Sequence, residues 1–217
     1  MDKDRESLEN LNSVYQTIKE DIIKRLEFFR SIRDKNDENL IFEELLFCIL
    51  TPQSKARMAD KAITNLKNKN LLFSDDVKLI SDELNVVRFK NNKAKYIIEA
   101  KKLFTQNGKI SIIDKIDSND IFKTRDWFVN NIKGYGYKEG SHFLRNIGLG
   151  MDLAILDRHI LKNLKNFSVI QDIPQSIGRK KYFEIEEKIK KFSEKVEIPL
   201  DHLDFVLWFK EAGEIFK

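Results

Sequence analysis

The stretch that decides the fold is Ile132-Lys133-Gly134-Tyr135-Gly136-Tyr137-Lys138, in which one tyrosine separates two glycines. Apolar residues recur at helical spacing on both sides, which predicts amphipathic helices over 120–131 and 137–147 joined by a short turn. Glycine permits a positive φ, or a close approach that a Cβ atom would block. The amides at the start of the second helix then point outward, with the positive end of the helix dipole behind them. This turn predicts an anion site on Gly134, Gly136 and Tyr137 that binds a DNA phosphate without reading base sequence.

The rest of the chain is also helical in its spacing. Eight glycines and three prolines in 217 residues leave little room for the turns of an all-β fold. Apolar stripes at helical spacing cover residues 8–26, 94–104 and 183–192. We expect an all-α fold of about ten to twelve helices and no sheet. The helices should form two subdomains beside a DNA-binding cleft, one from residues 1–44 and 150–217 and the other from residues 45–149.

Composition limits the cofactors and the cellular location. The formal net charge is +4 and the isoelectric point is near 8.9, which permits a nucleic-acid partner without demonstrating one. Cys48 is the only cysteine, so a cysteine-ligated iron–sulfur cluster or zinc ribbon is excluded. His142, His159 and His202 are not spaced as metal ligands, and we expect no metal and no other cofactor. The polar start and the lack of a long apolar run predict an intracellular protein, in the cytoplasm or nucleoid, without a membrane segment.

Lys138 and Asp157, nineteen residues apart, are the candidate catalytic pair. A neutral lysine amine can attack C1′ of a nucleotide and form a Schiff base, from which β-elimination cuts the strand. Lys138 lies in the first turn of the predicted second helix, whose positive end disfavours a further cation. Asp157 would stabilise the positive charge that develops on the sugar. Each residue also has a simpler interpretation, Lys138 as a solvent-exposed lysine and Asp157 as the N-cap of a helix over 158–165.

With these residues in place, the chain resembles the helix-hairpin-helix DNA glycosylase superfamily, with the motif at about 120–148. It looks most like the compact archaeal and bacterial branch of 8-oxoguanine DNA glycosylase/lyases, from about residue 40 to the end. The segments that carry this likeness are Leu50-Thr51-Pro52-Gln53-Ser54-Lys55-Ala56, Arg88-Phe89-Lys90-Asn91-Asn92-Lys93-Ala94, Gly140-Ser141-His142-Phe143-Leu144-Arg145-Asn146 and the run from Trp208 to Lys217. The missing cysteine cluster agrees with this branch and argues against the endonuclease III type.

The resemblance implies roles for further residues. It implies that Gln53 enters the base stack and that Arg88 and Phe89 contact the opposite or the damaged base. It also implies that Trp208 stacks on the flipped base and that the terminal segment ending at Lys217 helps to read the purine. Gln53 would otherwise be an ordinary residue at a helix start, and Trp208 a core aromatic.

The function implied is that of a bifunctional enzyme, a monomer that acts on double-stranded DNA containing 8-oxoguanine. It would excise the base through a Schiff base on Lys138 and then cleave the abasic site. Two alternatives remain open on the sequence: a glycosylase of the same fold for another lesion, such as an oxidised pyrimidine, and a non-catalytic DNA-binding module that only grips phosphates.

Overall fold

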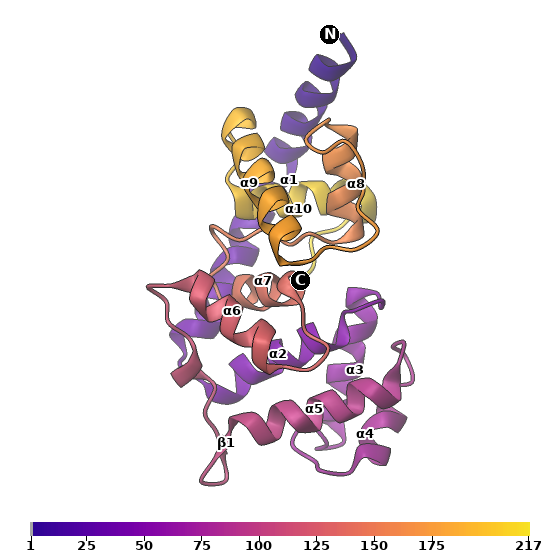
Figure 1. Ribbon diagram of the computed structural model, residues 1–217, viewed down its shortest axis with the longest axis vertical. Coiled ribbons are helices and arrows are strands. Elements are labelled where there is room, and N and C mark those ends of the chain that lie inside the picture. Colours follow the sequence, from indigo (N-terminus) through magenta and orange to yellow (C-terminus); the bar gives the residue numbers. More distant parts are fainter. Residues whose placement is uncertain (1) are drawn as a thin grey trace.

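Helices make up nearly all the regular structure of the computed structural model, as their apolar spacing predicts (Figure 1). The structure describes the backbone of residues 2–217 and the side chains from Leu8 onward. The polar side chains at the start of the chain, which were used to predict an intracellular location, lie outside the described part. The α-helices of residues 2–217 are α1 (Asp2–Asp34), α2 (Glu38–Leu50), α3 (Ala56–Asn68), α4 (Val77–Glu83), α5 (Lys90–Phe104), α6 (Ile121–Asn131), α7 (Tyr137–Asn146), α8 (Arg158–Asn166), α9 (Arg179–Val196) and α10 (Leu200–Ala212), and η1 (Ile113–Lys115) is a 3₁₀ turn.

One short hairpin corrects the expectation of no sheet. Strands β1 (Thr105–Gln106) and β2 (Lys109–Ile110) pair antiparallel, with Thr105 opposite Ile110. The two residues between them, Asn107 and Gly108, have φ values of 50° and 77°. An Asn-Gly pair with both φ angles positive is the preferred two-residue hairpin turn. The Asn107-Gly108 pair in the sequence is therefore the signal for this small sheet.

Aspartates begin four of the helices and set where the chain changes direction. Asp37, Asp76, Asp120 and Asp157 precede α2, α4, α6 and α8. The Asp120 carboxylate accepts from one amide of the following turn, and each of the other three accepts from two. Such caps satisfy donors that have no partner within the helix. The helix predicted to begin after Asp157 does begin there, at Arg158, with Asp157 as its N-cap.

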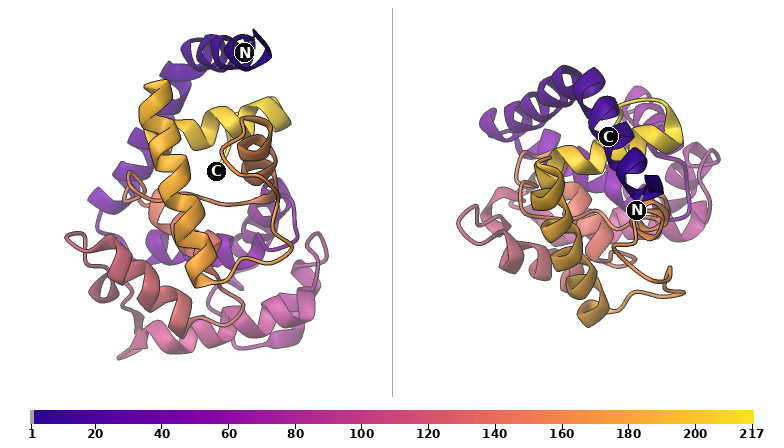
Figure 2. Two further views of the ribbon diagram at one scale, coloured as in Figure 1. Left: turned by 45° about the horizontal axis from the view of Figure 1, so that its top comes forward. Right: turned by 90° about the horizontal axis from the view of Figure 1, so that it is seen from above.

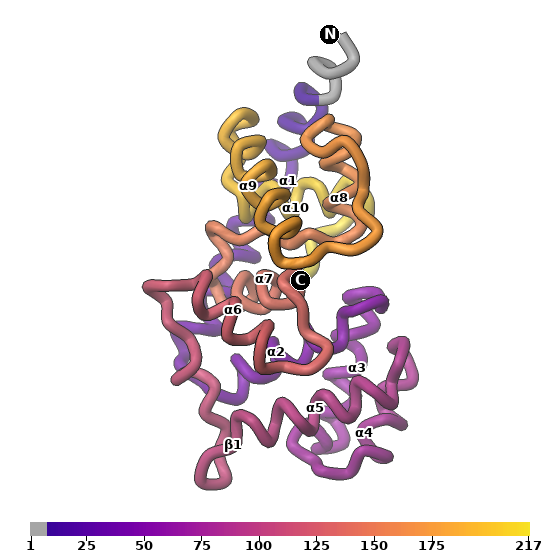
Figure 3. Tube along the Cα trace, viewed as in Figure 1, coloured from indigo at the N-terminus to yellow at the C-terminus, as the bar shows by residue number. Residues whose placement is uncertain are grey.

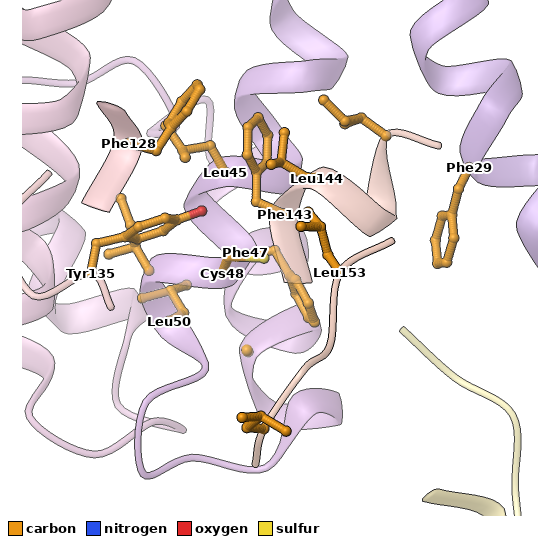
Figure 4. Packing of buried hydrophobic residues seen from close by; sticks show 14 of the residues in the cluster. Phe29, Leu45, Phe47, Cys48, Leu50, Phe128, Tyr135, Phe143, Leu144 and Leu153 are labelled. Atoms are coloured by element: carbon orange, nitrogen blue, oxygen red, sulfur yellow. The ribbon is translucent and has the colours of Figure 1, made fainter. Parts of the chain in front are cut away.

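Helix α2 lies at the centre of the molecule, and nearly all of its residues from Ile41 to Leu50 are buried. It packs against α1, α3, α5 and α7, and Figure 4 shows Phe47 and Cys48 of α2 beside Phe143 and Leu144 of α7. The boundary drawn from the sequence between residues 44 and 45 falls inside this helix.

The terminal helices form a second group above the central bundle. Helix α10 packs against α1, α8 and α9, while α1 extends downward to contact α7 and α2 (Figure 2). After α10 the chain end turns back toward the central bundle (Figure 3), where Lys217 Nζ binds Glu44 Oε1 of α2 at 2.7 Å. No helix within residues 2–217 is long and apolar enough to cross a membrane.

Candidate active site

The glycine turn between α6 and α7 has the predicted form. Gly134 has φ +71°, and a Cβ atom there would lie 2.5 Å from the Tyr96 ring, so conformation and space both require glycine. Gly136 is extended, and its amide donates to the Glu139 carboxylate at 3.1 Å. The later amides of the first turn of α7 belong to the set that lacks acceptors within the helix. A phosphate would therefore meet this first turn beside a carboxylate that already holds Gly136.

Lys138 projects from the first turn of α7 toward the end of α2. Its Nζ lies 3.1 Å from Thr51 Oγ1 and 3.7 Å from Glu139 Oε1, and its side chain is 22% exposed. The Thr51 hydroxyl donates to the Cys48 carbonyl at 2.9 Å. Its oxygen is therefore left as the acceptor for Lys138, which fixes the amine in a partly buried position.

Asp157 takes the simpler role considered above and also faces the pocket. One of its carboxylate oxygens accepts from the amides of His159 and Ile160, each at 2.8 Å, and so caps α8. Asp157 and Lys138 both line a single pocket. The cap holds the carboxylate rigidly, and its second oxygen takes no part in the capping bonds. The two interpretations of Asp157 are compatible in this geometry.

The pocket lies between the two groups of helices and has a cavity volume of about 70 Å³. The α2–α3 turn and α7 supply one wall, the segment before α8 and α10 supply the other, and the chain end closes it. Its lining residues are Thr51, Ser54, Ala56, Lys138, His142, Arg145, Ile155, Asp157, Asp204, Phe205, Trp208 and Lys217. Lys138 comes from the predicted subdomain of residues 45–149, whereas Asp157 and Trp208 come from the other predicted subdomain, and all three line this one pocket.

Trp208 and Lys217 line the pocket, as the base-pocket prediction requires. The buried Trp208 Nε1 has no hydrogen-bond partner in the protein, and the Trp208 ring meets His159 edge-on at 4.9 Å between ring centroids. Lys217 Nζ is held by Glu44 at 2.7 Å and Asp60 at 3.3 Å. Its ammonium group therefore anchors the chain end to α2 and α3.

Phe89, predicted as part of the base pocket, is not among the residues that line this pocket. It is 52% exposed and stands at the start of α5 with φ +58°. Arg88 is also exposed and lies over the Phe89 ring, 5.4 Å from its centroid. The Arg88 amide donates to Ser54 Oγ at 3.0 Å, next to exposed Gln53. Gln53, Arg88 and Phe89 thus form an exposed edge beside the pocket mouth.

Tyr137 contributes to the hairpin mainly through its backbone. Its hydroxyl donates to Asp126 Oδ1 at 2.8 Å and accepts from Arg179 Nε at 3.0 Å. Its ring packs against Tyr182 and Phe183 of α9. The side chain therefore ties α7 to α9, and the amide is the group left for a phosphate.

Three ionisable pocket residues were not predicted from the sequence as site residues. His142 and Arg145 follow Lys138 at four and seven residues on α7, and Asp204 precedes Trp208 by four on α10. Residues four or seven positions apart lie on the same face of a helix, so His142 and Arg145 share a face with Lys138 and Asp204 shares one with Trp208. The helical face of Lys138 and of Trp208 was the signal that could have found them.

Burial governs the charges of these residues. Burial lowers the pKa of His142 well below its ordinary value of 6.5, and the positive charges of Lys138 and Arg145 act in the same direction. Burial raises the pKa of Asp204 to about 6, against the opposing effect of Arg145, whose Nη1 lies 3.3 Å from Asp204 Oδ2. His142 is therefore neutral near pH 7 beside the lysine. The other two histidines, His159 and His202, lie on α8 and α10.

Within the described side chains, no three His, Cys, Asp or Glu residues are grouped as a metal site. Cys48 is buried, and burial raises the pKa of its thiol. A lysine and an aspartate in one pocket beside a helical hairpin with a glycine turn indicate a class of protein, the helix-hairpin-helix DNA glycosylases.

Comparison with known proteins identifies the family within that class. Residues 22–198 match the family model of 8-oxoguanine DNA glycosylase. The chain is 44% identical to an 8-oxoguanine DNA glycosylase/AP lyase of Fusobacterium nucleatum, over 99% of this chain and 100% of that protein. It therefore belongs to the 8-oxoguanine DNA glycosylase family.

Solved structures agree with this membership. The 8-oxoguanine DNA glycosylase of Thermotoga maritima superposes with a TM-score of 0.86 at 32% identity, covering 99% of this chain and 100% of the other. The Methanocaldococcus jannaschii 8-oxoguanine glycosylase/lyase, in complex with a 15mer DNA containing 8-oxoguanine, also gives 0.86, at 33% identity over 97% and 99%. The all-α fold predicted from the sequence is confirmed.

Proposed function

We propose that this protein is a bifunctional DNA glycosylase and AP lyase that removes 8-oxoguanine from duplex DNA and then cuts the strand. The observation that carries the proposal is the single pocket that holds Lys138, Asp157 and Trp208. An amine, a carboxylate and a stacking ring are the groups that base excision with strand cleavage needs. Family membership supplies the lesion, since the relatives of the chain are 8-oxoguanine glycosylase/lyases.

Lys138 is the proposed nucleophile. Its neutral Nζ attacks C1′ of the extruded nucleotide while the C1′–N9 bond breaks, and the base leaves with the electron pair of that bond and is protonated. Loss of a proton from Nζ and opening of the sugar ring give the Schiff base. Removal of a proton from C2′ then expels the 3′ phosphate and cuts the strand. Thr51, 3.1 Å from Nζ, orients the amine before attack.

Asp157 is the proposed electrostatic partner. Because its capping bonds fix it at the start of α8, the carboxylate offers a preorganised negative charge to the cationic sugar. Because the carboxylate is already in place, no groups need to rearrange when the positive charge develops on the sugar. The capping role thus supports the catalytic role of the same residue.

Trp208, Lys217 and the chain end are proposed to hold the flipped base. The 8-oxo form differs from guanine by an added N7–H donor and an O8 acceptor. Trp208 offers a stacking surface, and the anchored end places polar backbone groups in the pocket. Arg57 supports this end through Glu214 and through Phe216, whose ring centroid lies 4.8 Å from the guanidinium carbon.

The DNA partner is proposed to be held by the first turn of α7 around Gly134 and Gly136, and by the exposed edge of Gln53, Arg88 and Phe89. We propose a monomer, because the residues named for catalysis all come from one chain. Its substrate places it with the cellular DNA, in the cytoplasm or nucleoid.

The lysine nucleophile is tested by Lys138→Gln with borohydride trapping on a duplex that contains 8-oxoguanine. We expect the covalent adduct to disappear while DNA binding is kept, because glutamine cannot form the Schiff base. Lys133→Gln is the matched control, since Lys133 lies in the same turn with a 67% exposed side chain and should trap normally. An adduct in Lys138→Gln as strong as in the wild type would refute the assignment.

The lesion is tested on a panel of duplexes that contain 8-oxoguanine, thymine glycol or no damage. We expect product chiefly from 8-oxoguanine. Preferred release of thymine glycol would favour the glycosylase for oxidised pyrimidines, and binding without product on any duplex would favour the non-catalytic module.

The reaction is also proposed to need no metal or cluster, because the amine itself forms the intermediate. Prolonged treatment with EDTA should leave excision and strand cleavage unchanged, measured on the same duplex. A loss of activity restored by a divalent cation would contradict this expectation.

A further inference from the structure

Lys93 lies in the first turn of α5, outside the pocket. It is buried, with only 3% of its surface exposed. Its Nζ donates to the Leu50 carbonyl at 2.7 Å, the Pro52 carbonyl at 2.9 Å and Ser54 Oγ at 2.9 Å. An ammonium group has three donors, and here all are used. Burial lowers the pKa of Lys93 to about 8, so the ammonium is held at a cost that these acceptors offset.

All three acceptors belong to one short segment, the end of α2 and the turn that follows it. Leu50 ends α2, where carbonyls lack helical partners and the helix dipole is negative. Ser54 Oγ also accepts the Arg88 amide at 3.0 Å. Lys93 and Ser54 therefore join two separate loops, residues 51–54 and residues 87–89.

Each of these loops carries a strained residue. Gln53 and Phe89 have φ values of +54° and +58°, a region that residues with a Cβ atom rarely adopt. Both are exposed. Such conformations persist where the surrounding structure fixes them and are often found at functional sites. The turn of Gln53 is closed by the Ser54 amide, which donates to the Thr51 carbonyl at 2.9 Å, and is tied by the ammonium of Lys93 to α5. Through Ser54 the ammonium also reaches the loop of Phe89.

The 51–54 turn also reaches the proposed nucleophile. Thr51 contacts Lys138 Nζ, and Ser54 lines the pocket. One element thus presents Gln53 outward to the DNA and Thr51 inward to the amine. Its shape must be set before the damaged nucleotide arrives if the gap is to be filled as the base leaves.

We propose that Lys93 is a positioning residue for base extrusion, which holds the Gln53 turn and the Arg88–Phe89 loop as one preformed wedge. The inference rests on the proposed function, since a wedge has meaning only for an enzyme that extrudes its base. It adds a residue that touches neither the DNA nor the reacting atoms.

The test compares one lesion in two settings under single-turnover conditions: 8-oxoguanine paired with cytosine, and 8-oxoguanine at the centre of a short unpaired bubble. Lys93→Met removes the donors and keeps an apolar stem of similar length. We expect excision from the paired duplex to slow at least about tenfold, and excision from the bubble to slow much less, because extrusion is easier there. A 2-aminopurine beside the lesion should report slower extrusion.

Lys101→Met is the matched control. Lys101 lies on the same helix, and its Nζ holds the separate 73–75 loop through Phe73 and Asp75. It should leave the ratio of paired to bubble rates unchanged. Equal slowing of both substrates in Lys93→Met, or no slowing, would overturn the proposal. If thermal unfolding shows that Lys93→Met is not folded, Ser54→Ala is used in its place. We expect Ser54→Ala to slow excision from the paired duplex more than excision from the bubble, by a smaller factor than Lys93→Met. Failure of the wild type on both substrates would instead refute the proposed function.

Discussion

At the scale of the residue, the pocket places a neutral ring beside the amine that must react. Both ring nitrogens of His142 lack a hydrogen-bond partner in the protein, although the Lys217 backbone faces the ring. The ring packs edge-on against Phe47 at 5.5 Å between centroids. Protonation of the buried His142 ring would add a positive charge to those of Lys138, Arg145 and Lys217.

This arrangement predicts acid sensitivity that His142→Phe should reduce. The pKa of His142 in the folded protein lies well below 6.5, so near and below pH 6.5 the unfolded chain binds more protons than the folded protein. The contribution of His142 to the free energy of unfolding is therefore fully present above about pH 6.5 and is lost as the pH falls below it. The slope for one such group approaches about 1.4 kcal/mol per pH unit. Urea unfolding at several pH values from 8 to about 5 should show a shallower loss in the variant.

Asp204 has the opposite effect on the pH dependence of stability. The effect of His142 is therefore read from the difference between the wild type and His142→Phe. The folded pKa of Asp204 is raised to about 6, so its contribution is present at low pH and is lost as pH rises through that value. The difference between variant and wild type cancels this contribution. Parallel curves for the two proteins would show that His142 does not titrate within the fold as inferred.

At the scale of the element, the α6–α7 turn was the most predictable part of the molecule. A glycine pair between two apolar periodicities fixes a helix, a turn and a helix by local chemistry alone. The Lys93 contacts were not predictable, since they join residues about forty positions apart and leave no local pattern. The exposure of Phe89 was not predictable either, because nothing in its sequence neighbourhood shows that the chain turns it outward with φ +58°.

Gly134→Ala should measure what the turn demands. Alanine at φ +71° costs about 1 kcal/mol in conformation, and its Cβ would meet the Tyr96 ring at 2.5 Å. Gly108→Ala is the control, since Gly108 has φ +77° with nothing within 4 Å. Denaturant unfolding should show the larger loss for Gly134→Ala, together with weaker DNA binding. Equal losses would mean that the Tyr96 ring moves aside freely.

At the scale of the whole molecule, a buried ion pair joins the two groups of helices that form the pocket. Arg125 of α6 is fully buried, and its guanidinium binds both Glu186 oxygens at 2.6 and 2.8 Å. Glu186 lies on α9 and also accepts the Ala154 amide at 2.9 Å. The apolar stripe of α9 predicted the helix but not this pair, because a charged residue inside a stripe resembles a solvated position until its partner is known.

The pair predicts a large difference between two glutamates of the same helix. Glu186→Gln leaves the buried Arg125 without its counter-charge, and breaking such a pair costs about 3–5 kcal/mol. Glu184→Gln breaks the pair with Lys181, whose side chains are 51% and 45% exposed, and should cost less than about 1 kcal/mol. Thermal and denaturant unfolding of both variants checks the difference. The double variant Arg125→Met/Glu186→Leu should recover much of the loss, because it removes both charges and keeps the volume. If the double variant were as unstable as Glu186→Gln, the loss would come from packing and the Ala154 contact, and the ion pair would not be what joins α9 to the central bundle.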